Sequence, residues 1–303
     1  MHLGNGIICP VTGIPMLAVA AVSAFYAYKK ARKEFSKDKI FPAVSATALV
    51  FALQMINFAI PATGSSGHIV GAILLAVLMG PFAAFLAICS ILLVQSVFFA
   101  DGGLLALGCN IFNMGFLACF VAYPLLFKPF EKQNKPAFGA LLASIAALQL
   151  GAIAVVIEGG LSGSITLSNI LTFTGLMQAI HLPIGIVEGI VTALVVVAAK
   201  HVSAQKLSYA FGGISLVLAG IISQFASQKP DGLEWSLLNI SDSVVMQTQS
   251  IMYSLAEAVQ AKSAILAAMP SVFANIFGLL IVSIVMLAAC LLLSRNTVSE
   301  NAE

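Results

Sequence analysis

Residues 7–39 read IICPVTGIPMLAVAAVSAFYAYKKARKEFSKDK, and this stretch decides the fold of the chain. An apolar run over residues 7–28 is followed by a cluster of Lys and Arg over residues 29–39. About 20 apolar residues suffice for a helix to cross a bilayer, and basic clusters stay on the cytoplasmic side. The stretch therefore predicts an uncleaved membrane-spanning helix with the N-terminus outside.

The composition of the whole chain predicts the same class of protein. Sixty per cent of the 303 residues are hydrophobic and 9 per cent are charged, which excludes a soluble domain. The apolar segments are continuous, whereas those of membrane β-barrels alternate. Lipid requires every backbone amide to be hydrogen-bonded within its own segment, so we expect an all-α multi-span membrane protein. Its expected surroundings are a lipid bilayer, and no nucleic-acid partner is expected.

Nine apolar segments are expected to cross the membrane. Gly80-Pro81 divides one long run, because proline ends a helix at the preceding residue, and the first half is expected to be tilted or to cross incompletely. Of the 14 Lys and Arg residues, all but Lys229 and Lys262 then lie on the cytoplasmic side, with Arg295 closing the last span. The segments are 7–28, 40–60, 69–80, 81–100, 104–127, 137–157, 167–199, 208–226 and 271–294.

A shift in composition near residue 206 suggests two units. Residues 1–206 form a seven-span unit, and residues 207–303 form a two-span unit with an outer segment over residues 228–270. The distribution of basic residues predicts an extracytoplasmic N-terminus, and the expected location is the plasma (inner) membrane.

Met1-His2 is the stretch with the clearest chemistry. A free α-amine, the His2 amide nitrogen and the His2 imidazole can form adjacent five- and six-membered chelate rings around one metal ion. His68, in the only other histidine-bearing outer loop, can supply a fourth nitrogen, and planar nitrogen ligation suits Ni(II) or Cu(II). Met1 is expected to be retained because the large His2 follows it. The alternative is that neither histidine binds a metal: His2 can be incidental, and His68 can simply be solvated in its Gly/Ser loop.

Several polar residues at the outer ends of the predicted spans can support this site. Asp101, Asn57, Asn110 and Asn113 can orient the histidines, or they can simply bond one helix to another. His181 and Glu188 lie seven residues apart on one helix face. They can line a passage, pair with a partner subunit or form a packing contact inside the membrane.

The sequence has no motif for ATP hydrolysis or for other common enzyme chemistry. It contains no GxxxxGK[ST] phosphate loop, no HExxH and no GxSxG. We therefore expect a non-catalytic membrane component. The five cysteines form no CxxC pair and are interpreted as small buried hydrophobic residues.

Together, several stretches resemble the substrate-binding components of cobalt/nickel energy-coupling-factor transporters, of the CbiM/NikM type. The resemblance covers about residues 1–200, and Pro230-Asp231-Gly232-Leu233-Glu234 is similar to the small accessory component of that family, here fused to the C-terminus. The matching stretches are Met1-His2, QMINF at 54–58, Gly67-His68, FFADGGL at 98–104, LGCNIFNM at 107–114 and HLPIGIVE at 181–188.

The resemblance implies a seven-helix substrate-binding bundle that carries Ni²⁺ or Co²⁺ as its transported ligand. It implies metal ligation by Met1, His2 and His68, and it implies a transmembrane coupling subunit and two ATP-binding subunits as partners. Family members commonly have proline and an acidic residue where this chain has Gly4-Asn5. We therefore expect a more flexible arm that lacks one negative charge near the metal.

Two other functions fit the same sequence. A stand-alone channel or proton-coupled divalent-metal permease would use His181 and Glu188 as a relay. A vitamin-binding component of the same transporter superfamily would hold an organic ligand and no metal.

Overall fold

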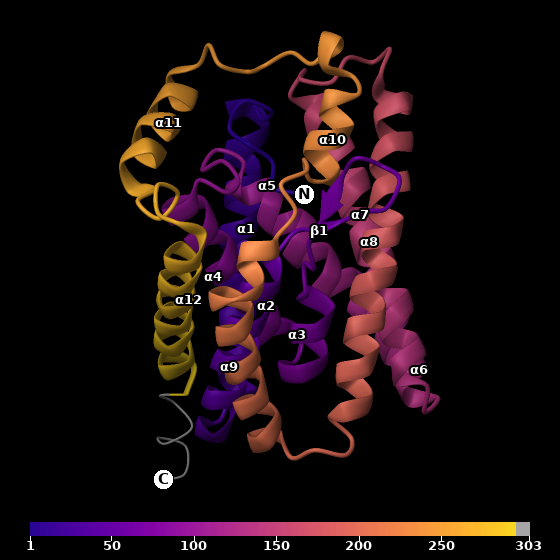
Figure 1. Cartoon of the computed structure of the whole chain (residues 1–303), viewed down its shortest axis with the longest axis vertical. Coiled ribbons are helices and arrows are strands. Elements are labelled where there is room, and N and C mark those ends of the chain that lie inside the picture. Colours follow the sequence, from indigo (N-terminus) through magenta and orange to yellow (C-terminus); the bar gives the residue numbers. More distant parts are fainter. Residues whose placement is uncertain (295–303) are drawn as a thin grey trace.

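The computed structural model describes residues 1–294, and Arg295, expected to mark the inner end of the last span, lies outside this range. Long helices run side by side, and the N-terminal arm, α10 and α11 gather at one end of the bundle (Figure 1). The helices of four or more residues are α1 (Pro10–Glu34), α2 (Ile40–Gln54), α3 (Ala72–Met79), α4 (Pro81–Val94), η2 (Gln95–Phe99), α5 (Leu107–Ile111), η3 (Phe112–Phe127), α6 (Lys128–Lys132), α7 (Pro136–Leu161), α8 (Ile170–Ala198), α9 (Ala204–Gly220), η4 (Ile222–Phe225), α10 (Gly232–Leu238), α11 (Ile251–Ser263) and α12 (Ser271–Ser294).

Six helical stretches in residues 1–294 are long and apolar enough to cross a membrane, so the chain is a multi-pass membrane protein. They are Pro10–Glu34, Pro81–Phe99, Leu107–Lys132, Pro136–Leu161, Ile170–Ala198 and Ser271–Ser294. The remaining three predicted spans are also helical, but they are shorter than expected. They correspond to α2, α3 and α9, and α2 ends six residues before the expected limit at residue 60.

The short helix α3 lies inside the bundle and has a clear start and stop. Gly71 and Gly80, at its two ends, have φ values of 72° and 81°, a region of backbone space that side chains disfavour. Pro81 then begins α4, as a proline at the first helical position commonly does. The division expected at Gly80-Pro81 is therefore present.

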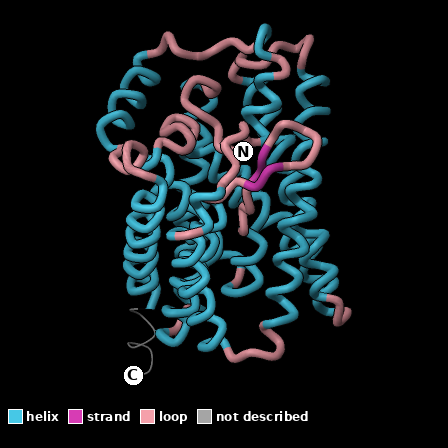
Figure 2. Tube along the Cα trace, viewed as in Figure 1, coloured by secondary structure: helices cyan, strands magenta, loops and turns pink. Residues whose placement is uncertain are grey.

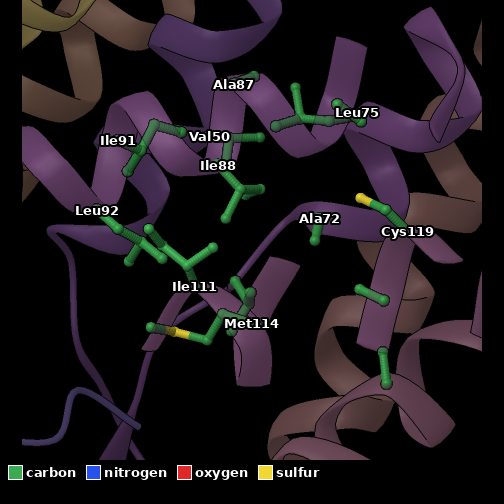
Figure 3. Packing of buried hydrophobic residues seen from close by; sticks show 14 of the residues in the cluster. Val50, Ala72, Leu75, Ala87, Ile88, Ile91, Leu92, Ile111, Met114 and Cys119 are labelled. Atoms are coloured by element: carbon green, nitrogen blue, oxygen red, sulfur yellow. The ribbon is translucent and has the colours of Figure 1, made fainter. Parts of the chain in front are cut away.

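The core lies where α2, α3, α4 and η3 meet. Val50, Leu75, Ile88 and Met114 come from these four elements and are buried together (Figure 3). Cys119 is fully buried in the same cluster, as expected for a cysteine that serves as a small apolar side chain.

The end of the bundle where the N-terminus lies carries the only regular strands within residues 1–294. Strands β1 (Phe58–Ala59) and β2 (Ser66–Gly67) pair antiparallel, and Ser66 also pairs in parallel with Asp231 from the C-terminal segment. In Figure 2 this small sheet lies beside the N-terminus, whereas the α8–α9 connection lies at the opposite end. The hairpin therefore brings His68, one residue beyond β2, to the same end as Met1.

Candidate metal site

The N-terminal arm, defined as residues 1–6, is fixed against the loop that follows η2. The Leu3 N–H donates to Asn110 Oδ1 at 2.8 Å, and the Leu3 carbonyl accepts from the Gly103 N–H at 2.8 Å and from Asn110 Nδ2 at 3.1 Å. At Gly102, φ is +82°, and an added Cβ would lie 2.8 Å from Asn110 Nδ2. Glycine is therefore required for this close approach. Asn110 bonds the backbone of the arm at Leu3 and does not bond the imidazole of His2 or of His68.

His2 is oriented by Asp101. Helix η2 ends in a wide π turn at Phe99, and Ala100 adopts a left-handed conformation, which directs Asp101 towards the arm. Asp101 Oδ1 lies 2.5 Å from His2 Nδ1. Burial alone would raise the pKa of Asp101, but the charge and hydrogen bond of His2 outweigh burial and bring the pKa below its ordinary value.

His68 is held through the backbone of its loop. The Val70 N–H donates to Glu188 Oε2 at 2.7 Å, and Gln54 Nε2 donates to the Val70 carbonyl at 2.7 Å. Both backbone polar groups of Val70 are therefore bonded to buried side chains of α8 and α2. Glu188 thus acts on the His68 loop from inside the bundle, a role that its position in the sequence did not reveal.

The two imidazoles lie next to each other and have unused nitrogen atoms. The ring centroids of His2 and His68 are 5.1 Å apart, and Nε2 of each ring is buried without a hydrogen-bond partner. Buried polar atoms are normally paired, so two orphaned nitrogens at one place are unusual. Burial, with the positive charges of the N-terminal amine and His2, lowers the pKa of His68 to about 3. The His68 imidazole is therefore neutral and able to bind a cation.

The Met1 amine lies against a residue that the sequence did not single out as a site residue. The amine nitrogen is 3.0 Å from Asp231 Oδ2, and both groups are largely buried. Burial would raise the pKa of Asp231, but the charge of the amine, with the hydrogen bonds from the Glu234 N–H and from the amine, brings it well below its ordinary value. Asp231 belongs to the Pro230–Glu234 string noted in the sequence, but a separation of 230 residues gave no sign of this contact.

Asn5, where the chain departs from its expected family pattern, is buried and fully engaged. Its Oδ1 accepts from the Leu105 N–H at 2.8 Å, and its Nδ2 donates to Glu257 Oε1 at 2.6 Å and to Gln260 Oε1 at 2.8 Å. The arm is therefore tied down at this position, contrary to the flexibility expected from Gly4-Asn5. An aspartate at position 5 would lack the two donated hydrogen bonds and would face the Glu257 carboxylate.

The other predicted site residues make their hydrogen bonds to groups other than the two imidazoles. The Asn57 carbonyl accepts from the Ser227 N–H at 2.8 Å, and Asn113 Nδ2 donates to Glu158 Oε2 at 2.6 Å inside the bundle. His181 Nδ1 lies 2.7 Å from the Met177 carbonyl, and its ring faces the start of α10. The structure thus groups Met1, His2, His68, Asp101 and Asn110, and Asn57 lines the same cleft as the two histidines. Asn113 is instead bonded to Glu158 inside the bundle.

Two hollows adjoin this group. A cleft of about 420 Å³ is lined by His2, His68, Asp101 and Asp231. A much smaller cavity of about 10 Å³ is lined by Met1, His68, His181 and Asp231, and so shares His68 and Asp231 with the cleft. Among residues 1–294, no three side chains of His, Cys, Asp or Glu converge as metal ligands, but a site built from two imidazoles, an amine and an amide nitrogen does not require three.

The geometry also shows that His2 cannot be oriented by Asp101 and chelate a metal ion at the same time. A six-membered ring that includes the His2 amide nitrogen must close through Nδ1, and Nδ1 is the atom bonded to Asp101. Asp101 therefore cannot keep this hydrogen bond while His2 forms that chelate. Closing the ring requires Nδ1 to leave the carboxylate.

Residues 2–206 match the family described as the cobalt uptake substrate-specific transmembrane region, CbiM. The chain belongs to the CbiM family. Residues 205–295 match a second family, the PDGLE domain. The chain therefore joins a CbiM region to a PDGLE domain.

Relatives of this CbiM-family chain carry names of metal transporters. It is 34% identical over 227 residues to a protein of Archaeoglobus fulgidus named as a fused nickel transport protein, NikMN, and the match covers 74% of each chain. It is 25% identical over 204 residues to the cobalt transport protein CbiM of Clostridium tetani, covering 64% of this chain and 82% of that one.

A solved structure described as a truncated transition metal transporter has the same fold. It is 31% identical, with a TM-score of 0.60, and the match covers 66% of this chain and 99% of that one. The fold and the family together make this chain a membrane component of the metal-transport type.

Proposed function

We propose that this CbiM-family chain is the substrate-binding component of an ATP-driven importer, and that its N-terminal arm captures Ni²⁺ or Co²⁺ at the outer face. The Met1 amine, the amide and imidazole nitrogens of His2 and the His68 imidazole form the ligand set. The observation that carries the proposal is the adjacent placement of the two imidazoles, with the buried Nε2 of His68 left without a hydrogen-bond partner and able to bind the ion that the arm chelates.

The surroundings of these nitrogens favour a divalent cation. Asp101 and Asp231 place two carboxylates on the cleft that reaches the histidines, and negative groups in a cleft raise the local concentration of cations. His68 is neutral, as a metal-binding imidazole must be. Binding then moves His2 Nδ1 from Asp101 to the metal, and the Asp101 carboxylate stays beside the positive complex.

Planar nitrogen ligation favours nickel as the cargo. Square-planar sites of nitrogen ligands are typical of Ni(II) and Cu(II), whereas zinc prefers a tetrahedral cage. Cobalt stays within the proposal because cobalt transport is named for the family and for a relative.

Import against a gradient requires an energy source outside this chain. Since the sequence has no phosphate loop, we propose a transmembrane coupling subunit and two ATP-binding subunits as partners. In this arrangement residues 1–206 form the metal-binding unit and residues 207–303 form the accessory unit. The Lys- and Arg-rich end of the bundle faces the cytoplasm of the cell and the arm lies outside the plasma membrane.

Vesicles that contain purified full-length chain alone provide the test of partner dependence. We expect them to bind radioactive nickel without accumulating it inside, because no group in the chain can use ATP. Accumulation that depends on a pH gradient would instead establish a proton-coupled permease. Co-purification of an organic ligand without metal would establish a vitamin-binding component.

A further inference from the structure

The C-terminal unit contacts both ends of the metal-binding arm. At the start of the arm, Asp231 Oδ2 lies 3.0 Å from the Met1 nitrogen. At its other end, Glu257 and Gln260 of α11 accept from Asn5, and the Gly6 carbonyl accepts from the Gln247 N–H at 2.7 Å. Residues 1–6 therefore lie between the first unit and a wall that the second unit supplies.

Asp231 is itself rigidly placed. Its Oδ1 accepts from the Glu234 N–H at 2.8 Å and caps α10, while the Asp231 N–H donates to Glu234 Oε2 at 3.1 Å. The preceding segment is bonded to β2, because the Ser66 N–H donates to the Pro230 carbonyl at 2.8 Å and Ser66 Oγ donates to the Lys229 carbonyl at 2.8 Å. The second carboxylate oxygen is thus left to face the amine.

Gly232 allows this placement. A Cβ at Gly232 would lie 3.0 Å from His181 Cε1 and 3.2 Å from His181 Nε2. The start of α10 therefore sits directly on the His181 ring of α8, and this contact sets the depth at which Asp231 enters the site. His181 thus packs against the turn that carries Asp231.

We infer that Asp231 is a positioning residue for metal binding, supplied by the C-terminal unit, which orients the α-amine of Met1 towards a divalent cation. This inference rests on the proposed function of the arm. An amine that binds a metal through its lone pair keeps two N–H donors, so the hydrogen bond to Asp231 Oδ2 persists when the ion is bound. Such outer hydrogen bonds fix the direction of a ligand's lone pair.

Asp231→Asn tests this role without removing the helix cap. The asparagine Oδ1 still accepts from the Glu234 N–H, whereas its Nδ2 places a donor where the amine needs an acceptor. Glu234→Gln is the matched control, because it removes one negative charge from the same turn and does not contact the amine. Both variants are made in the full-length chain.

Two measurements on these proteins are needed. In the metal-free proteins, amide hydrogen exchange over residues 3–8 is expected to be about tenfold faster in Asp231→Asn, the factor expected for loss of one charge-assisted hydrogen bond. The dissociation constant for Ni²⁺ alone is expected to rise roughly 10- to 100-fold. Glu234→Gln is expected to match the wild type in both.

The outcomes separate this inference from the proposed function. Wild-type exchange and affinity in Asp231→Asn would overturn the role of Asp231, and so would equal effects of Asp231→Asn and Glu234→Gln, since these would indicate only a weakened α10. A wild-type chain that binds no nickel would overturn the proposed function, while faster exchange in Asp231→Asn would still show that Asp231 positions the arm.

Discussion

Among single residues, His68 shows how burial keeps a proposed metal ligand neutral. Its pKa of about 3, far below the ordinary 6.5, means that the folded protein keeps His68 neutral down to that pH, whereas the unfolded chain takes up a proton below pH 6.5. His68 therefore favours folding above pH 6.5, and this contribution is lost progressively as the pH falls towards 3. Protonation of His68 should not compete with metal between pH 7 and pH 5.

A pH series with His68→Ala tests this directly. We expect the substitution to weaken nickel binding at least about 100-fold, as loss of a direct ligand should exceed loss of an outer partner, with unchanged helical content by circular dichroism. The ratio of wild-type to variant affinity should be equal at pH 7 and pH 5. An ordinary pKa of 6.5 would instead shrink that ratio about thirtyfold at pH 5.

The sequence singled out the proposed ligand residues but not all of their partners. Met1-His2 and His68 stood out because few other residues in an outer loop can bind a metal. Asp231 was not identified as a partner of Met1, because pairing between the two units is set by the fold of the segment after α9. Asn113 was predicted to support the histidines, because it shares a helix face with Asn110. In the structure its side chain is buried and donates a hydrogen bond to Glu158 instead.

Among the elements, the loop that carries His68 depends on helix α8. The buried Glu188 accepts from the Val70 N–H, and a buried N–H without an acceptor is destabilising by about 1–3 kcal/mol. Glu188→Ala should therefore loosen the loop and weaken nickel binding roughly 10- to 100-fold. Glu188→Gln keeps an acceptor oxygen and should bind nearly as the wild type does, as measured by isothermal titration.

This pair of variants also separates two roles of Glu188. A proton relay needs a group that ionises, so it would fail in Glu188→Gln, whereas a positioning role survives that change. Strong loss of binding in Glu188→Gln would contradict the positioning role.

The sequence predicted one of the two local features near the His68 loop. The short α3 was expected from Gly80-Pro81. The hairpin β1–β2 was missed, since each strand has only two residues and leaves no alternating pattern.

For the whole molecule, apolar runs and basic clusters predicted an all-α multi-span bundle, and the structure has that architecture. The exact ends of the spans could not be predicted, because contacts with distant segments help to set them, as they do just after α2. For example, the Asn57 carbonyl, just after α2, bonds the Ser227 N–H. Contacts between distant segments set such limits, and periodicity carries no information about them.

The account depends most on the α-amine of Met1 as a metal ligand. The most direct measurement is elemental analysis of purified full-length protein, with the wild type beside a variant that carries one glycine before Met1 and beside Nα-acetylated protein. We predict that the wild type retains stoichiometric nickel or cobalt, while both blocked proteins lose it and keep their helical content by circular dichroism in metal-free buffer. Full metal content in the blocked proteins would contradict the account.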